Sequence, residues 1–372
     1  MRLVTLVFLL FIPILSVKAL ATPITSQPTG EARVAWPVTA PLSQPDGLRP
    51  CCAFGYNLKA QALGIPVPFY QLGNVVHADQ LGAHVYNDSA FNAVGNLLGL
   101  GSEQSGLVYT HQGGFIDIAH VRDTADNTLF LFSQLLPRLG EQWYIDLGPE
   151  LANRRIQLHA FSPPQDPAQR YTLAAYLAGE LAFQIAAWHE IAQWYGYQSV
   201  MGFSEEVSGF SPEDLYSNLL GARLAIDAIL QGRAASVASY DSAMETLLPA
   251  ALHQLGAVPV AETQRQFDGI DGDWWNSHRR VPEKFLVLKR DYHTGNNRLP
   301  SQPASESTAP QRLTLPLQIQ GFTLSNLGEL QLWPGDTLRN LPPPAKYYRP
   351  EDFNGLALHA QAQDARQILQ QR

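Results

Sequence analysis

Cysteine is scarce in this sequence: the chain of 372 residues contains two, Cys51 and Cys52, and they are neighbours. A disulfide between adjacent cysteines closes a small ring with a distorted peptide bond, and such bonds are rare. The alternatives in an oxidising compartment are buried free thiols, a mixed disulfide, or one reactive thiol beside an inert one. We favour two buried side chains that behave as small hydrophobic residues.

Positive charge is also in short supply. The chain has 25 Lys and Arg residues against 33 Asp and Glu residues, which gives a formal net charge of −8. Loss of Arg2 and Lys18 with an N-terminal leader would take this charge to −10. Non-specific binding to nucleic acid or to an anionic membrane depends on clustered Lys and Arg. The composition therefore argues against nucleic acid as a partner.

The apolar run at the start of the chain is too short to span a membrane. It extends from Val4 to Val17, about 14 residues, whereas a spanning helix needs roughly 20. It follows Arg2 and leads into Ala19-Leu20-Ala21, the small-x-small pattern that signal peptidase reads. We expect residues 1–21 to be a bacterial-type signal peptide with no transmembrane anchor after its cleavage. No cysteine follows directly, which disfavours a lipid anchor, and the mature protein is expected to be periplasmic or secreted.

Composition shifts divide the remaining chain. Pro, Thr, Ser and Gly dominate an extended leader, a main globular domain follows, and a polar Pro/Ser/Asn-rich linker leads to a short strand-like region and a polar tail. With 45% hydrophobic residues, a core can be built. The expected segments are leader 22–48, main domain 49–293, linker 294–312, small β segment 313–345 and tail 346–372.

Apolar spacing predicts a mainly helical α+β domain. Helices are expected over 116–139, 171–195 and 211–231, the last with Ser211 as N-cap and Pro212 at its first position. The helix over 171–195 is apolar nearly all round, so it should be buried at the centre, packed on the other two. Short peripheral strands are expected over 107–110, 285–288 and 313–332, with turns at Gly113-Gly114, Gly321 and Gly328, and short strands or irregular loops are expected over 65–76.

The polar residues of the central helix carry the chemical hypothesis. His189 and Glu190 stand in an apolar helix, where a carboxylate is costly unless it is paired, hydrogen-bonded or bound to a metal. In metallohydrolases a His-Glu pair on a helix supplies a ligand and a general base, with a second His four residues on. That position is Gln193 here, so the zinc-protease motif is incomplete. A missing ligand must come from another segment.

We expect His120, His189 and Glu206 to be the metal ligands, with Glu190 as general base. Arg122 and Asp123, beside His120 on its predicted helix, complete the candidate catalytic set. Asp117, Asp123 and Glu205 are alternative ligands, and zinc is the metal expected. The competing interpretation is a structural ion-pair network in which His120, Arg122 and Asp123 meet Glu190 where two helices pack.

Two further sites are weaker. Cys51 or Cys52 with His120 would supply the thiol and imidazole of a thiol hydrolase. Trp274-Trp275 could stack on a sugar, although two aromatic residues are more often part of a core. The functions that remain open are a secreted metal-dependent hydrolase of envelope or extracellular material, a non-catalytic envelope protein that is structural or binding, and a Cys-His thiol hydrolase.

Several blocks of sequence resemble a known family. They read CCAFG from Cys51, GGFIDIAHVRD from Gly113, WHEIAQWYG from Trp188 and FSPEDLYSNLLG from Phe210. Together they are similar to an uncharacterised bacterial secreted family that is catalogued as a domain of unknown function. The resemblance spans about Arg49 to Leu341 and implies no activity, so the candidate residues depend on the physical argument alone.

Overall fold

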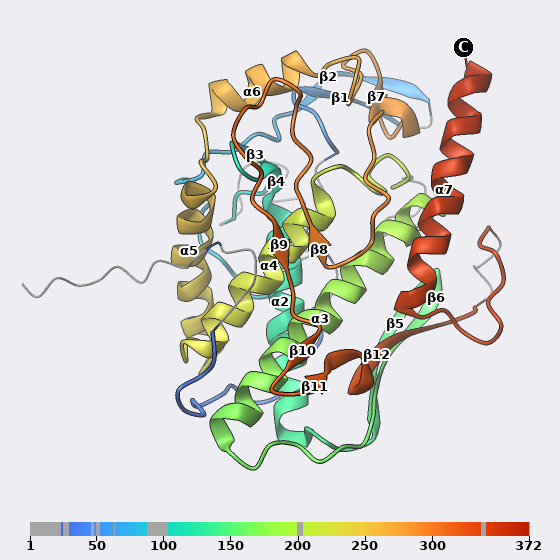
Figure 1. Ribbon diagram of the computed structural model, residues 1–372. Helices are drawn as coiled ribbons and strands as arrows, with labels where there is room; N and C mark the ends of the chain where they lie inside the picture. Colours follow the sequence, from blue (N-terminus) through green and yellow to red (C-terminus); the bar gives the residue numbers. More distant parts are fainter. Residues whose placement is uncertain are drawn as a thin grey trace, which may run out of the picture.

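The computed structural model describes residues 24, 30–45, 48–49, 53–62, 64–87, 103–198, 204–335 and 340–371. The expected signal peptide and both cysteines lie outside these residues. Within them the chain has a mainly helical α+β fold, as expected, with short strands around central helices (Figure 1). None of the described helices is both long enough and apolar enough to span a bilayer.

Helix α3, Pro167–Trp194, forms the centre of the fold. Asp166 caps it by accepting a hydrogen bond from the Gln169 backbone N–H, and Pro167 occupies the first position, where a missing N–H costs nothing. From Tyr171 onward nearly every residue is buried. The predicted central helix is therefore confirmed, and it begins four residues before the expected start at Tyr171.

Helices α2, Ile118–Leu135, and α4, Asp214–Leu230, pack on α3 and on each other. The backbones of α2 and α4 come close together at Gly221, where a Cβ atom would lie 2.0 Å from the Val121 carbonyl oxygen. Only glycine leaves room for the backbones to meet at this point. This contact brings the N-terminal halves of α2 and α4 together, and these halves carry the candidate site.

The helix start predicted at Ser211 is wrong by a few residues. Helix α4 begins at Asp214, and the Ser211 hydroxyl donates to Glu213 Oε2 instead of capping the backbone. Phe210, just before, has a φ of 59°, so the chain turns sharply there. The segment 211–213 is a turn that leads into the helix.

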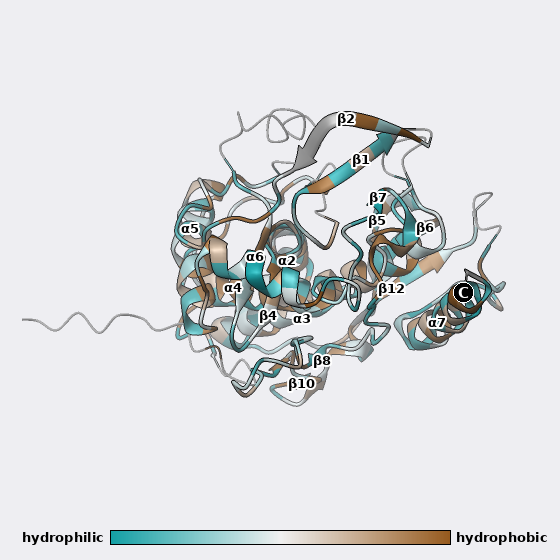
Figure 2. Ribbon diagram, turned by 90° about the horizontal axis from the view of Figure 1, so that it is seen from above, coloured by the Kyte–Doolittle hydropathy of each residue, from teal (hydrophilic) through white to brown (hydrophobic). Residues whose placement is uncertain are grey.

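Three more helices surround this centre. Helix α5, Val237–Gln254, starts with a capping box between Ser236 and Ser239, and α6, Val260–Gly269, follows it. Helix α7, Pro350–Gln371, lies at the edge of the molecule in Figures 1 and 2. Its Asp364 accepts hydrogen bonds from the Trp194 indole and the Tyr292 hydroxyl. The predicted polar tail thus contains a docked helix with buried apolar residues.

The strands form small sheets. Strands β5, Trp143–Glu150, β6, Ala152–Leu158, and β12, Gly328–Trp333, form an antiparallel sheet in the order β12-β6-β5 beside α3. Strands β1, Leu58–Ala62, and β2, Ile65–Leu72, pair as a hairpin next to β7, Arg280–Val281. Strands β3, Leu107–Thr110, and β4, Gly114–Asp117, form the predicted strand and turn. The short strands β8, Asn297–Arg298, β9, Leu313–Thr314, β10, Gln318–Ile319, and β11, Phe322–Thr323, complete the set.

Two hydrophobic clusters form the interior. The larger one joins α2, α3, α4 and α5 with residues from the 313–332 region and α7. The smaller one contains Trp274 and Trp275, packed with Phe54, Phe115 and Phe267. Both tryptophans are at least 95% buried, so the interpretation as core residues is confirmed. The strand expected over 285–288 is wrong: residues 284–286 form a single 3₁₀ turn, and Leu286 belongs to this core.

Candidate metal centre

Asp117 ends strand β4 and caps helix α2. Its Oδ1 accepts hydrogen bonds from the backbone N–H groups of Ala119 (2.7 Å) and His120 (3.2 Å). An Asp at this position stabilises the first turn of the helix. Its own backbone N–H donates to Ser217 Oγ on α4 (2.9 Å), which holds the two helix starts together. The cap uses only Oδ1, and Oδ2 stays available toward the site.

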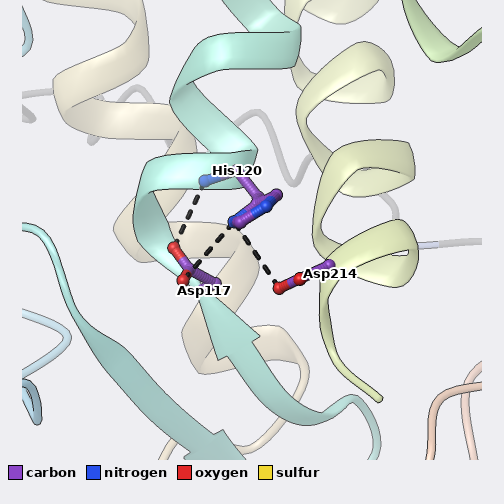
Figure 3. Close-up of side chains that lie close together, drawn as sticks. All are labelled: Asp117, His120 and Asp214. Atoms are coloured by element: carbon purple, nitrogen blue, oxygen red, sulfur yellow. Dashed lines mark hydrogen bonds and ion pairs between the residues drawn. The ribbon is translucent and has the colours of Figure 1, made fainter. Parts of the chain in front are cut away.

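His120 lies in the first turn of α2, between Asp117 and Asp214 (Figure 3). Its Nδ1 is 3.4 Å from Asp117 Oδ2 and 3.6 Å from Asp214 Oδ1. Asp214 is the first residue of α4, so the three side chains come from the facing ends of two helices. All three residues are buried, and their potential ligand atoms lie within 4.8 Å of one another.

Two glutamates extend this cluster. On the other edge of the His120 ring, Nε2 is 3.7 Å from Oε1 of Glu190, which belongs to α3. The second Glu190 oxygen, Oε2, accepts a hydrogen bond from the Phe210 backbone N–H (2.8 Å). Glu213 directly precedes Asp214, and its Oε2 accepts from the Ser211 hydroxyl (2.9 Å). The acidic cluster, as we call Asp117, Glu190, Glu213 and Asp214 around His120, is contributed by α2, α3 and the start of α4.

The acidic cluster has more buried acceptors than donors. Five of its carboxylate oxygens have no hydrogen-bond partner among the described residues, and they are Asp117 Oδ2, Glu190 Oε1, Glu213 Oε1 and both Asp214 oxygens. Burial raises the pKa of Glu213 to about 8, and the nearby Asp117 charge adds to the shift. Burial also raises the pKa of Asp214 well above its usual range, although His120 opposes the shift. Carboxyl groups in this setting require protons or a cation.

The distances from His120 Nδ1 to the two aspartate oxygens fit a metal site. Bonds of about 2.0–2.1 Å from an ion to nitrogen and oxygen ligands in tetrahedral geometry place neighbouring ligand atoms about 3.3 Å apart. The separations of His120 Nδ1 from Asp117 Oδ2 and from Asp214 Oδ1, 3.4 Å and 3.6 Å, are close to this value. They are longer than an ordinary hydrogen bond between the same atoms. One imidazole and two carboxylates form a three-ligand set that leaves a fourth position open.

The structure brings His120 and Glu190 together, but the other predicted ligands lie elsewhere. His189 Nδ1 contacts Glu150 Oε1 at 2.5 Å, and Glu150 also accepts from Arg154. Because successive helix residues point about 100° apart, His189 faces the sheet while Glu190 faces α2. Glu206 is partly exposed, and its carboxylate is 3.9 Å from Lys284 Nζ.

Arg122 and Asp123 belong to a separate buried network centred on Arg49. The Arg49 guanidinium contacts Glu103, Asp123 and Asp126 at 2.6–2.9 Å. Arg122 donates to two backbone carbonyl groups and lies 3.5 Å from Glu103. His84 bonds Asp126 at 2.9 Å. This network is well supplied with donors, in contrast to the acidic cluster.

Sequence reasoning named Asp117 as an alternative ligand but missed Asp214 and Glu213. Acidic residues are common in the first turn of a helix for a purely structural reason, and Asp214 does stand in the first turn of α4. The sequence does contain one signal for these two residues: two consecutive acidic residues stand at the start of a helix that is mainly apolar. The partner of Asp214 is on another helix, so no local spacing could identify it.

Fold and site together define a mainly helical α+β protein built around a buried acidic cluster. Residues 39–304 match the family model described as Protein of unknown function (DUF4056), and the chain belongs to this family. The resemblance expected from the four sequence blocks is confirmed. Comparison with curated proteins found no match. Comparison with solved structures found none either.

Proposed function

We propose that this protein is a metal-dependent hydrolase that holds one divalent ion between Asp117, His120 Nδ1 and Asp214. The observation that carries the proposal is the set of buried carboxylate oxygens without donors around a single imidazole. A buried ionised carboxylate without a partner is expensive, and a divalent cation provides one. The ligand spacing given above is an independent support.

The donor types favour zinc or manganese. Imidazole nitrogen suits zinc, and carboxylate oxygen is accepted by zinc and preferred by manganese. Calcium takes six to eight oxygen ligands, whereas this set has a nitrogen at its centre. Zinc remains the first choice, and manganese is the metal to compare with it.

Hydrolysis is the chemistry that such a centre supports. A metal with three protein ligands keeps a fourth position for water and lowers the pKa of that water toward neutrality. The cluster also offers a carboxyl group that could take the proton, Glu213. Glu213 is next to Asp214 in the chain and has a buried oxygen without a donor. The competing function is a non-catalytic envelope protein, in which the same polar residues fix the packing of the helices without a metal.

Metal analysis of the purified protein tests the proposal. We expect about one zinc or manganese ion per chain, removed by a chelator and restored by adding either metal alone. His120→Ala should abolish this binding. The metal-loaded protein should then be assayed on a panel of ester, amide and phosphoester substrates, with the chelated protein and His120→Ala as controls. A wild-type protein that takes up neither metal contradicts the proposal and favours the non-catalytic alternative. Metal binding without hydrolysis of any substrate would contradict the catalytic part of the proposal.

We also propose that the protein works outside the cytoplasm, periplasmic or secreted, because of the signal-peptide pattern in residues 1–21. N-terminal sequencing of protein recovered from the periplasm or medium should begin at or near Thr22. A cell-associated protein that keeps Met1 would contradict export by this route.

A further inference from the structure

We propose that Glu190 is a positioning residue that keeps a proton on Nε2 of His120 and so makes Nδ1 the metal-binding nitrogen. This inference rests on the proposed metal site and assigns Glu190 a role different from that of general base. The base would then be another carboxyl group of the acidic cluster, and Glu213 is the candidate.

The two ring nitrogens of His120 face different partners. Nδ1 faces Asp117 and Asp214, at 3.4 Å and 3.6 Å. Nε2 faces Glu190, at 3.7 Å from Oε1. An ion held by Nδ1 therefore lies on the opposite edge of the ring from Glu190. Glu190 is therefore placed to act on the ion through the His120 ring.

The missing hydrogen-bond donor at Glu190 indicates which nitrogen of His120 carries the proton. Glu190 is fully buried, and Oε1 has no hydrogen-bond donor among the described residues. An N–H on Nε2 is the donor that this geometry can supply, after a shift of a few tenths of an ångström. A bare Nε2 would instead place its lone pair opposite a carboxylate in a buried setting. A histidine that binds a metal through one nitrogen usually donates its other N–H to a carboxylate or carbonyl group in this way.

Glu190 is itself held in place by the segment that carries another ligand. The Phe210 backbone N–H donates to Glu190 Oε2 at 2.8 Å, and Phe210 precedes Asp214 by four residues. The backbone of Phe210 has a φ of 59°, a conformation that non-glycine residues seldom adopt. Its carbonyl group accepts from the Asp291 N–H at 2.9 Å, which fixes the turn from the other side. One carboxylate thus links the His120 ring to the start of α4.

The tautomer can be read directly by NMR. In wild-type protein with ¹⁵N-labelled histidine, the His120 signals are assigned by their loss in His120→Ala. We expect a proton on Nε2 both without metal and with zinc, and Nδ1 should shift when zinc is added. A proton on Nδ1 and zinc on Nε2 would overturn the inference while leaving the metal site intact. A proton on Nε2 in a protein that binds no metal would support the Glu190–His120 contact and contradict the metal proposal.

Glu190→Gln measures the effect on binding. An NH2 group replaces one of the two carboxylate oxygens, of which one faces Phe210 N–H and the other faces His120 Nε2. One of these two contacts is therefore lost, and zinc affinity should fall by roughly 10- to 100-fold, as for other outer-shell partners of metal ligands. Glu180→Gln is the matched control, because Glu180 is a partly buried glutamate on the same helix, bonded to Asn296 instead. Equal zinc affinity in wild type and Glu190→Gln would overturn the inference. If Glu190→Gln does not fold, the wild-type spectrum alone still tests it.

Discussion

His120 on α2 and Asp214 at the start of α4 face each other where these two helices pack, with Nδ1 and Oδ1 3.6 Å apart. Gly221 lets the backbone of α4 come close to the Val121 carbonyl group of α2 at the same packing contact. Packing and chemistry are therefore linked: the same crossing that buries apolar surface also buries an aspartate. Neither Asp214 oxygen has a hydrogen-bond donor among the described residues. A cation beside these oxygens would therefore stabilise the ionised carboxylate.

Asp214→Asn should separate metal binding from stability. Loss of a direct ligand should weaken zinc binding by more than the roughly 100-fold upper figure for outer-shell partners. In the chelated protein the same change should leave the melting temperature equal or higher, because it removes a buried carboxyl group whose oxygens have no hydrogen-bond donor among the described residues. Calorimetric titration with zinc and thermal melts with a chelator measure the two effects.

Asp227→Asn is the control for this substitution. Asp227 lies on the same helix, and burial raises its pKa to about 6, while Arg223 opposes that shift. Its replacement should leave zinc affinity unchanged. A strongly destabilised Asp214→Asn in the absence of metal would show that Asp214 belongs to a structural network instead.

Much of the fold could be predicted from the sequence because its strongest signals are local. Helix α3 is apolar all round, so its burial follows from composition alone. The hairpin of β5 and β6 was missed for an equally local reason. Its turn places Leu151 at a φ of 54° instead of using glycine or asparagine, and charged residues such as Arg154 and Arg155 interrupt its apolar pattern.

The site could be predicted only in part because its contacts are not local. His120 and Glu190 attract notice as polar residues in apolar helices. The choice between His189 and Asp214 as ligand depends on which face of α3 meets α2 and where α4 begins. Neither can be read from spacing within one helix. Arg49 and its partners illustrate the same point, since its Glu103 contact joins residues 54 positions apart.

His189→Ala and His120→Ala should differ in metal content: His120→Ala should lose the metal and His189→Ala should keep it. His189 contacts Glu150 and not the acidic cluster, so His189→Ala should keep its metal. It should lower the free energy of unfolding by about 3 kcal/mol, the lower end of the range for breaking a buried ion pair, because Arg154 still bonds Glu150. Metal content and urea unfolding of the two variants check this. Loss of metal from His189→Ala would instead support the ligand set predicted from the sequence.

Arg49→Ala should be among the most destabilising single changes in the fold. It leaves Glu103, Asp123 and Asp126 without the guanidinium that contacts all three. Stranded buried charges cost about 3–5 kcal/mol in the free energy of unfolding. The comparison is Arg138→Ala, which breaks an exposed pair with Glu141 and should cost no more than about 1 kcal/mol. Similar urea midpoints for the two variants would contradict a structural role for Arg49.

Glu306 provides a pH test of the segment 294–312. Burial opposes its ionisation, but hydrogen bonds from His111, Thr308 and Tyr109 outweigh burial and lower the pKa of Glu306 to about 2. Because this folded-state value is below the ordinary value of 4.5, Glu306 stabilises the fold above about pH 4.5. That contribution is lost as the pH falls toward 2.

Glu306→Gln should therefore be less stable than wild type at pH 6, and the difference should shrink steadily as the pH falls from 4.5 to 2.5. Urea unfolding over this range measures it, with Glu141→Gln on the surface as the control for the substitution itself. The result also bears on domain organisation, because this segment was predicted to be a linker. A free linker would show no stability difference at any pH, whereas a segment docked on β3 through Glu306 requires the pH-dependent one.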